Sequence, residues 1–548
     1  MKLVERRLMM QKQTCQSSQV LAMYDVRGIQ KYIFKTAKVK DAIGASSIVE
    51  HILLDALKES VQKVQKAEHL EVELEWCTNT EPLRYTEQQK DISVLFVGGG
   101  NAYVLFRDRA LCIQINRWMS KYILEHTYSL QLAVAIVDKS NNYANDYSKV
   151  HQEMIQTKAN MSMMKPLGTL PIMQMEIKTG YPMISSEGST ETVLKQKETK
   201  KSQNIEREEQ IFDNYVTKKG QDSQLAIVHI DGNNMGIRIR QLVEGISDYE
   251  EAVNQMRTIS YHIDSSYKKV FEQMQEFFTK EAVNLEIYEE KEKNFFVRKI
   301  LVAGDDITYV CNAKLALATV EYFCREIATY TMNGKQDEDS LREYGFSVCA
   351  GVSYIGSHFP FFIGYEVAEA CCDSAKSRAK EKTNMDGNRI GNFVDFHICK
   401  NIQAVDLKEM RKREYVTSHG EQLLLRPYYI ATKTEGALGK LNKEPFAFEK
   451  CKNAVIYFQN EDNLPRNFAK KLRNTYSMGK QMVDTFWMFL ESRNWTMPEE
   501  NKDMMYFQDE KGTWIARWYD ALELMEDYID VDEIGGDNNV SDKNPTIK

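Results

Sequence analysis

The residues in this chain best suited to metal chemistry are the adjacent carboxylates Asp305 and Asp306, within "RKILVAGDDITYVCN" (298–312). The apolar runs on either side are typical of two strands joined by a tight turn, which puts both aspartates at a hairpin tip. A third aspartate, Asp231, ends the strand-like run of "LAIVHIDGNNMG" (225–236). Clustered carboxylates repel one another and raise one another's pKa unless a cation neutralises them. These residue types and their spacing therefore favour a site for hard divalent cations.

Such a site also suits phosphate chemistry. Magnesium binds carboxylate and backbone oxygens at about 2.0–2.1 Å and keeps positions for substrate phosphates. Two ions roughly 3.5–4 Å apart activate an attacking hydroxyl and neutralise a departing pyrophosphate. Gly232 and Gly304 let the backbone approach a phosphate closely. In "AEACCDSAKSRAK", Lys376 and Lys380 lie on one helical face, where two ammonium groups suit the β and γ phosphates of a nucleotide.

Each of these fragments also has an ordinary structural explanation. Gly-Asp at a hairpin tip is common turn chemistry, an aspartate after a strand caps a helix, and paired lysines often cover a solvated surface. The sequence has no GxxxxGK[ST] loop, so phosphate binding of the P-loop kind is excluded. The occurrence of the aspartates at matching places of one repeated unit favours the functional interpretation.

The elements that must position these residues recur twice along the chain. The first set follows the order β-α-β-β-α-β-α of ferredoxin-like sheets, with strands and helices expected at 20–28, 40–64, 91–106, 109–126, 130–137 and 143–160. The same order returns at 225–236, 248–280, 297–311, 313–330, 346–356, 365–382 and 392–398. Asp25 matches Asp231, and "VGGGN" (97–101) matches "AGDD" (303–306). The chain is thus predicted to be a divergent duplication.

The predicted fold is α+β, with two ferredoxin-like domains followed by a C-terminal helical bundle. The domains are predicted at 1–180 and 223–404, joined by a polar linker at 181–222 that has few aromatic residues. Residues 405–535 carry aromatic, Leu and Met residues at helical spacing, and 536–548 are a polar tail.

The composition describes a soluble, cytoplasmic protein. The 548 residues are 43% hydrophobic and 27% charged, with a formal net charge of −8, which argues against a broad non-specific grip on nucleic acid. Ten cysteines occur without a CxxC pair, which speaks against a zinc ribbon and against a disulfide framework. The N-terminus is a poor signal peptide, and no apolar run approaches the roughly 20 residues that span a bilayer. We expect no membrane association.

Together, "YDVRGIQKYIFKTAKVKDAIGAS", "HIDGNNMG", "VAGDD" and the lysine helix resemble Cas10, also known as Cmr2 or Csm1, the large subunit of type III CRISPR effector complexes. The resemblance covers roughly residues 20–400. More distantly, the second repeat is similar to GGDEF diguanylate cyclases, whose A-D-x-A-L-Y-x-A-K-x-x-G-R-N helix parallels Ala368–Lys380.

The resemblance implies two palm (cyclase-polymerase) domains that condense ATP into cyclic oligoadenylate messengers for antiviral defence. It makes Asp231, Asp305 and Asp306 the catalytic metal ligands of a Mg²⁺ or Mn²⁺ two-ion site, with Gly232 offering its carbonyl. Gly304 would lie close to the nucleotide, and Lys376 and Lys380 would bind the triphosphate of ATP. A second ATP would present its 3′-hydroxyl from the first palm. The implied partners are crRNA, target RNA and other type III CRISPR subunits.

The sequence departs from the family pattern in places. Ala303 replaces the first glycine of the GGDD motif, and Asn233, which stands where some relatives have an aspartate, is not taken as a ligand. The first repeat reads GGGN at 98–101 and lacks the carboxylate pair, so it is expected to bind a nucleotide or structure and not to catalyse; Asp25 is then structural or an acceptor contact. No His-Asp dipeptide occurs, and we expect neither the HD nuclease nor the zinc ribbon of relatives.

Two other functions stay open. One is a cyclic dinucleotide synthase of GGDEF type that uses GTP or mixed NTPs, and the other is a non-catalytic scaffold subunit of a crRNA complex. The sequence also leaves open the base specificity, the product ring size, activation by RNA or partner subunits, and the oligomeric state, a homo-oligomer included.

Overall fold

The computed structural model describes residues 19–34, 39–66, 68–74, 90–98, 100–162, 170, 172–177, 179–201, 214–218, 222–281, 296–387, 389–401, 406–433, 436–498, 505–509, 511–530 and 532. The chain forms two compact units: residues 1–205, 234–265 and 303–305 make the first, and residues 206–233, 266–302 and 306–548 make the second. The polar tail predicted at 536–548 and most of the 202–222 stretch lie outside the described residues.

The first unit is built on a five-stranded sheet in the order β2-β3-β4-β1-β5. Its strands are β1 (Val20–Arg27), β2 (Val72–Glu73), β3 (Ile92–Gly98), β4 (Asn101–Phe106) and β5 (Gln131–Asp138). Its helices are α2 (Ile29–Phe34), α3 (Val39–Gln65), α4 (Arg109–Thr127), α5 (Tyr143–Asn160), α6 (Thr190–Lys201) and α7 (Met235–Glu244), and a short ribbon joins β6 (Met183–Ser185) to β7 (Gly188–Ser189). The central strand β1 lies antiparallel to both β4 and β5.

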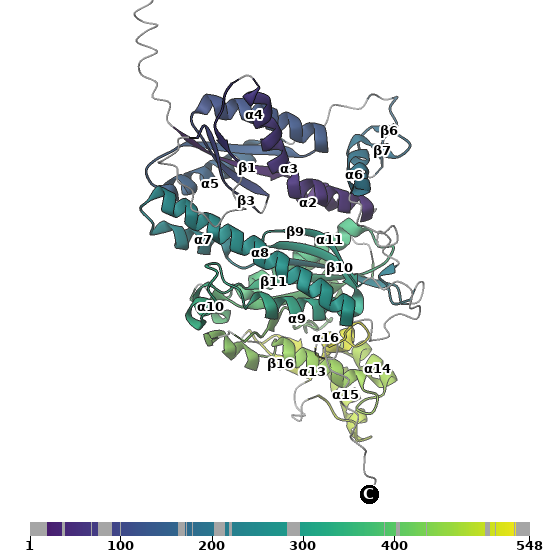
Figure 1. The fold of residues 1–548 in the computed structure, drawn as a ribbon. Helices are drawn as coiled ribbons and strands as arrows, with labels where there is room; N and C mark the ends of the chain where they lie inside the picture. The colour runs from purple at the N-terminus through teal and green to yellow at the C-terminus, as the bar shows by residue number, and fades with distance from the viewer. Residues whose placement is uncertain are drawn as a thin grey trace, which may run out of the picture. The chain divides into compact units, whose positions relative to one another are not determined.

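Helices cover both faces of this first sheet because its central strands are apolar on both faces. The Tyr24 hydroxyl of β1 donates to Asn116 of α4 over 2.6 Å. Tyr103 of β4 stacks on Tyr147 of α5 with ring centroids 5.6 Å apart. Since Tyr103 lies opposite Met23, the neighbour of Tyr24 in β1, the two tyrosines point to opposite faces. Helices α4 and α5 therefore pack on opposite sides of the sheet, as the ribbon also shows (Figure 1).

The second unit has a six-stranded sheet in the order β15-β14-β11-β8-β10-β9. Its strands are β8 (Gln224–Gly232), β9 (Val297–Ala303), β10 (Asp306–Asn312), β11 (Val348–Gly356), β14 (Asn392–Ile398) and β15 (Tyr428–Ile430), and β12 (Met385–Asp386) pairs with β13 (Arg389–Ile390) in a separate ribbon. Helix α8 (Tyr249–Glu281) is shared between the units, and α9 (Ala316–Ile327), α10 (Glu338–Tyr344) and α11 (Phe361–Ala379) follow, with 3-10 turns η4 (Ala313–Leu315) and η5 (Lys382–Asn384).

The duplication predicted from the sequence is confirmed by the two strand orders. In the first unit β5, β1, β4 and β3 lie side by side, and in the second unit β11, β8, β10 and β9 repeat that arrangement. Both sheets thus place the fourth, first, third and second strands of a ferredoxin-like unit in sequence across the sheet. The predicted α+β class, with two such domains and a helical C-terminal region, is correct.

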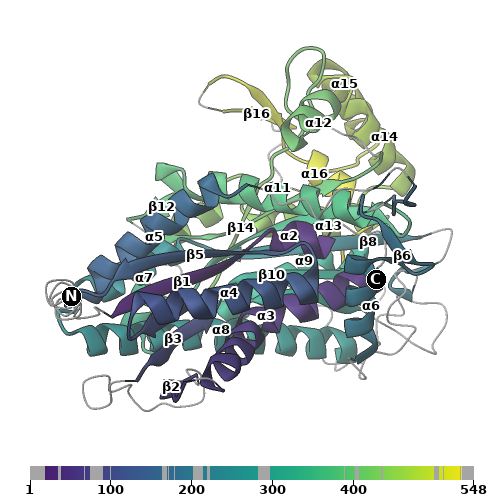
Figure 2. The same ribbon diagram turned by 90° about the horizontal axis from the view of Figure 1, so that it is seen from above.

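In the second sheet, too, helices lie on both faces. On one face the Tyr309 hydroxyl donates to Thr319 of α9 over 2.8 Å, and Phe271 of α8 packs on the Tyr309 ring. On the other face α11 approaches the sheet so closely that a Cβ on Gly351 of β11 would lie 1.9 Å from the Ala368 carbonyl oxygen. Figure 2 shows α11 beside β14, the strand next to β11.

We expect Gly351→Ala to destabilise the second unit, because the added methyl group meets the backbone of α11. Overpacking of this kind costs about 1–3 kcal/mol. Gly356 ends the same strand, and a Cβ added there would meet no atom within 4 Å, so Gly356→Ala is the matched control. Urea unfolding of both variants checks the expectation. Equal midpoints for the two variants would contradict the close contact.

The prediction of a polar linker is wrong for residues 190–201, which form helix α6 and pack against α3. The Lys195 ammonium is buried and donates to Glu191 and to the Tyr32 carbonyl, each over 2.6 Å. Gln196 donates to Asp41 of α3 over 2.9 Å. Because these polar groups satisfy one another, a segment without an apolar stripe is buried, which hydropathy cannot reveal.

The C-terminal region contains the predicted helices together with short strands. The helices are α12 (Leu407–Glu414), η6 (Gly436–Lys443), α13 (Phe448–Gln459), α14 (Arg466–Tyr476), α15 (Lys480–Glu491) and α16 (Tyr519–Leu524), and β16 (Tyr506–Gln508) pairs with β17 (Trp514–Ala516). Helices α13 and α14 pack on α16, and α15 packs on α14 (Figure 1). Strand β15 extends the six-stranded sheet, so this region belongs to the second unit. The predicted domain boundaries stay predictions.

No helix among the described residues is both long and apolar enough to cross a membrane.

Candidate active site

The site is built from residues of the second unit, beginning with the facing aspartates Asp231 and Asp306. Strand β10 runs antiparallel to β8, with Ile307 opposite Ile230. Continuing this register by one residue places Asp306, the first residue of β10, opposite Asp231 near the end of β8. Facing residues of an antiparallel pair lie about 4.5–5.5 Å apart at Cα and share one face of the sheet. The side chains of both aspartates are 32% exposed, so solvent reaches them.

The hairpin that carries Asp306 has the predicted tight turn. Gly304 and Asp305 connect β9 to β10, and Gly304 has φ +64°. A positive φ at the first turn residue is the pattern of a type II′ hairpin turn, which favours glycine there. Residues 303–305 group with the first unit, so Asp305 is described only by its place in this turn. Gly232, the last residue of β8, lies opposite Val348 of β11.

Helix α11 supplies a cation to this face of the sheet. The Lys376 ammonium forms an ion pair and hydrogen bond with Asp231 Oδ2. Burial lowers the pKa of Lys376, whereas the charge of Asp231 and its hydrogen bond raise it; the net effect of all neighbouring groups is a raised pKa, so the ammonium stays charged. Lys380 is the C-cap of α11 and is exposed, one turn beyond Lys376. The structure thus brings Lys376 to the carboxylates, whereas Lys380 lies at the rim of the helix.

Three residues that were not selected from the sequence complete this face. His229 lies two residues before Asp231 and opposite Thr308. Its Nδ1 is 3.1 Å from Thr308 Oγ1 and 3.5 Å from Asp306 Oδ1. Its ring meets Tyr365 of α11 edge-on, with centroids 5.7 Å apart. Burial lowers the pKa of His229 to about 4, so the imidazole is neutral at pH 7.

Periodicity was the signal that could have found these residues. A strand alternates its side chains between faces, so His229 must share the face of Asp231. On α11, Tyr365 and Lys376 are eleven residues apart, about three turns, which puts both on one face. The prediction from the sequence used the strand and helix periodicities only to place aspartates and lysines, so it missed these residues.

Asn233, which was excluded as a ligand from the sequence, is buried. Its backbone N–H donates to the Ser347 carbonyl over 2.9 Å, and its amide donates to the Gly391 carbonyl over 3.0 Å. These bonds tie the end of β8 to neighbouring strands of the second unit. Asn233 therefore has a structural role.

The first unit repeats the lysine contact but not the carboxylate pair. Lys158 of α5 donates to Asp25 of β1 over 2.5 Å, as Lys376 of α11 does to Asp231. Opposite Asp25 stands Asn101, in the register position that Asp306 holds in the second unit. Burial raises the pKa of Asp25, against the effect of Lys158. The site around Asp25 thus has one carboxylate, one lysine and one amide, and carries less negative charge than the site around Asp231 in the second unit.

A divalent cation can be held by three or more protein side chains, or by one or two carboxylates supplemented by water and substrate. The residues of the second unit fit the second arrangement. No group of three or more His, Cys, Asp or Glu side chains in the described part of the chain is arranged to hold a metal. Magnesium, however, is usually held by one or two carboxylates together with water and substrate phosphates. The facing Asp231 and Asp306 supply two such carboxylates, and Gly232 at the strand end offers a carbonyl oxygen.

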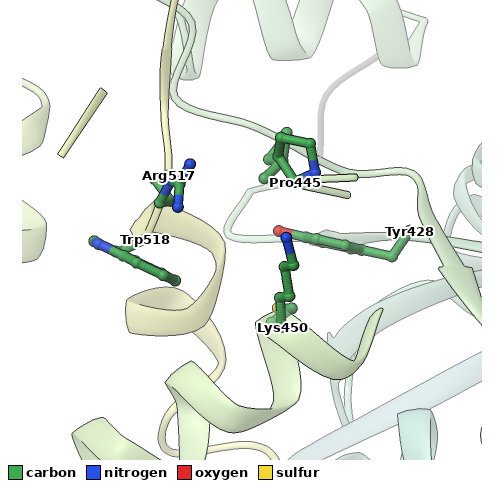
Figure 3. A pocket seen from close by; sticks show the side chains of 7 residues that line it. Tyr428, Pro445, Lys450, Arg517 and Trp518 are labelled. Carbon is green, nitrogen blue, oxygen red and sulfur yellow. The ribbon is translucent and has the colours of Figure 1, made fainter. Parts of the chain in front are cut away.

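A separate small hollow lies in the C-terminal part of the second unit (Figure 3). Leu425, Tyr428, Pro445, Lys450, Cys451, Arg517 and Trp518 line it. Lys450 there donates to the Lys443 carbonyl over 2.8 Å, and the Arg517 guanidinium lies 5.5 Å from the Trp518 ring centroid. The predicted site residues are all elsewhere, so this hollow is not the candidate active site.

Two ferredoxin-like sheets in one chain, the second with facing aspartates beneath a lysine-bearing helix, define a tandem palm-type α+β protein. Residues 224–387 match the family model of Cas10/Cmr2, second palm domain. The resemblance to Cas10 is confirmed over these residues by this similarity. No curated protein sequence matches the chain significantly.

Several solved structures of Csm1–Csm4 assemblies resemble the chain distantly. The Csm1–Csm4 cassette in complex with cA4 is 11% identical, with 93% of this chain and 69% of that chain covered and a TM-score of 0.49. The cassette with AMPPNP is 13% identical, covering 82% and 64%, with a TM-score of 0.38. The Csm1–Csm4 subcomplex of a type III-A interference complex is 13% identical, covering 93% and 69%, with a TM-score of 0.41. Likeness at this level supports no inference about chemistry.

Proposed function

We propose that this protein is a metal-dependent nucleotidyltransferase that converts ATP into cyclic oligoadenylate messengers in a type III CRISPR-like defence. The proposal rests on two partly exposed aspartates, Asp231 and Asp306, that face each other on adjacent strands. Helix α11 places Lys376 on the same face of the sheet. The match of residues 224–387 to the Cas10/Cmr2 second palm domain supports the same interpretation.

In this proposal each residue has a distinct part. Asp231, Asp306 and the Gly232 carbonyl would hold Mg²⁺ or Mn²⁺, and Asp305 in the adjacent turn would join them. Bound there, the metal would supply Lewis-acid activation of the attacking 3′-hydroxyl and charge neutralisation of the pyrophosphate. Gly304 would let the backbone approach a phosphate at the turn, and Lys376 and Lys380 would hold the triphosphate.

The test is an incubation of the purified protein with each NTP and with Mg²⁺ or Mn²⁺, followed by mass spectrometry of the products and a pyrophosphate assay. Cyclic oligoadenylates formed only from ATP and only with metal are the expected result. Products from GTP would favour a cyclic dinucleotide synthase. Absence of any product, with crRNA, target RNA and partner subunits supplied, would leave the scaffold function. Co-purification of the native protein identifies those partners.

Lys376→Met is expected to raise the KM for ATP while the protein still binds metal. Lys376 neutralises Asp231 in the structure, and an arriving triphosphate would compete for its ammonium. A charged hydrogen bond is worth about 1.5–3 kcal/mol, which corresponds to roughly a 10–100-fold change in KM. Steady-state kinetics at saturating Mn²⁺ measure it.

The matched control is Lys382→Met, because Lys382 is exposed in η5 beyond the end of α11. Its KM should equal that of the unmodified protein. An unchanged KM in Lys376→Met would remove Lys376 from the triphosphate site.

A further inference from the structure

The last turn of α11, which carries Lys376 and ends at Lys380, is tied to a segment far away in the sequence. The tie is made by Arg378, a half-buried residue of this turn. Its Nη1 donates to the Leu425 carbonyl over 2.6 Å and to the Pro427 carbonyl over 3.0 Å. A guanidinium presents its N–H donors in a fixed plane, so one side chain holds two carbonyls in a defined geometry.

Further contacts fix Arg378 at its side chain and at its backbone. The guanidinium carbon lies 4.1 Å from the ring centroid of Phe446, a cation–π contact. The Arg378 carbonyl accepts from the side-chain amide of the buried Asn384 over 3.0 Å and from the Glu381 N–H over 3.1 Å. The last carbonyls of a helix lack partners within the helix, so these bonds also stabilise the end of α11.

The segment that accepts the Arg378 bonds is itself held by α16. Its backbone N–H groups at Leu425 and Arg426 donate to Asp520 Oδ2 over 2.9 and 3.0 Å. On its other side, the last turn of α11 meets the end of β8 through the ion pair of Lys376 and Asp231. This turn is therefore held between β8 and a segment that is anchored in the C-terminal region.

The first unit has a similar tie at the end of its own lysine-bearing helix. Lys158 of α5 contacts Asp25 there. Arg27 donates to the carbonyl of Met161, the C-cap of α5, over 2.8 Å. A guanidinium–carbonyl bond thus holds the C-terminal end of the lysine-bearing helix in both units, although one arginine belongs to a strand and the other to the helix itself.

We propose that Arg378 is a positioning residue that locks the last turn of α11 and thereby holds Lys376 and Lys380 in place for a triphosphate. The inference deepens the proposed function and rests on it. Without the two carbonyl bonds the turn is free to move away from residues 425–427, and both lysines move with it. Residues that act on a site through packed and hydrogen-bonded neighbours typically change its coupling by about 2–30-fold. The C-terminal helices then take part in nucleotide binding, since Asp520 holds the accepting segment.

The experiment uses the full chain and two measurements. Calorimetry gives the affinity for a non-hydrolysable ATP analogue at saturating Mn²⁺, and electron paramagnetic resonance gives the affinity for Mn²⁺ alone. In Arg378→Met we expect the analogue to bind about 2–30-fold more weakly. Mn²⁺ alone should bind as in the unmodified protein, because Asp231 and Asp306 are unchanged. Arg378→Lys keeps the charge, but its side chain ends one atom short of Nη1, so its analogue affinity should fall between the two.

The matched control is Gln459→Leu. Gln459 of α13 also donates to two backbone carbonyls, those of Met525 and Tyr528, over 3.1 and 2.8 Å. Neither carbonyl lies in α11 or in residues 425–427. The control variant should therefore bind the analogue as the unmodified protein does.

Equal analogue affinity in Arg378→Met and Gln459→Leu overturns the assignment, provided that Lys376→Met still weakens binding. A parallel loss of Mn²⁺ and analogue affinity in Arg378→Met also overturns it, because that result marks a general loss of structure. If Arg378→Met does not fold, Arg378→Lys decides: weaker analogue binding with intact Mn²⁺ binding supports the assignment, and unmodified analogue affinity overturns it. If the unmodified protein itself binds no ATP analogue, the proposed function fails.

Discussion

Asp306→Asn should strongly reduce metal-dependent pyrophosphate release and leave the fold intact. The substitution removes one of the two facing charges while keeping the shape of the side chain. Metal activation is worth several kcal/mol of transition-state stabilisation, so its loss lowers the rate by about 10²–10⁴-fold. A hairpin of this kind accommodates asparagine at this position, because in the first unit Asn101 lies opposite Asp25 in the equivalent register.

Pyrophosphate release with ATP and Mn²⁺ measures the effect, and thermal unfolding monitors the fold. Glu366→Gln is the control, since Glu366 lies on the exposed side of α11 and its change also removes one negative charge. It should retain full activity. Equal activity in Asp306→Asn and Glu366→Gln would show that the facing aspartates do not carry the chemistry.

Arg426→Met should lower the free energy of unfolding of the second unit by about 3–5 kcal/mol. The Arg426 side chain is fully buried and lies 3.6 Å from Asp520 and 3.1 Å from Glu523 of α16. Its guanidinium also lies 4.0 Å from the ring centroid of Phe396 in β14. Methionine preserves much of the volume but removes the cation from the buried Asp520 and leaves the buried Glu523 with only the half-exposed Lys400, 3.4 Å away, and this accounts for the large cost.

Chemical denaturation measures the loss, with Arg466→Met as the control. Arg466 and Glu526 form an ion pair in the same C-terminal region, but their side chains are 56% and 38% exposed. Such exposed pairs contribute about 0–1 kcal/mol. Equal midpoints for the two variants would mean that the Arg426 cluster does not hold α16 to the sheet.

Much of the fold could be predicted because its strands and helices are local patterns. The run of apolar residues that became β8 and the hairpin that became β9 and β10 lie where the sequence placed them. Recurrence of the same order of elements predicted the duplication. The ferredoxin-like arrangement then implied that the end of β8 and the start of β10 are neighbours, which the register of the two strands confirms.

The partners of the charged groups could not be predicted in this way. Lys376 was assigned to phosphate, yet in the structure its ammonium pairs with Asp231. Helix α6 was interpreted as linker because its buried face is polar, and Lys195 and Glu191 neutralise each other there. Both outcomes depend on which charges meet after the helices pack.

The sequence by itself determined the repeated α+β order, the two tight hairpins and the residue types available at the second one, because these follow from local periodicity and turn chemistry. Only the tertiary structure decided that His229 faces Asp306, that α11 lies directly on the sheet at Gly351, and that Arg426 joins α16 to β14. Those contacts join segments far apart in the chain, and the free energy of burying a polar group depends on the partner it finds there.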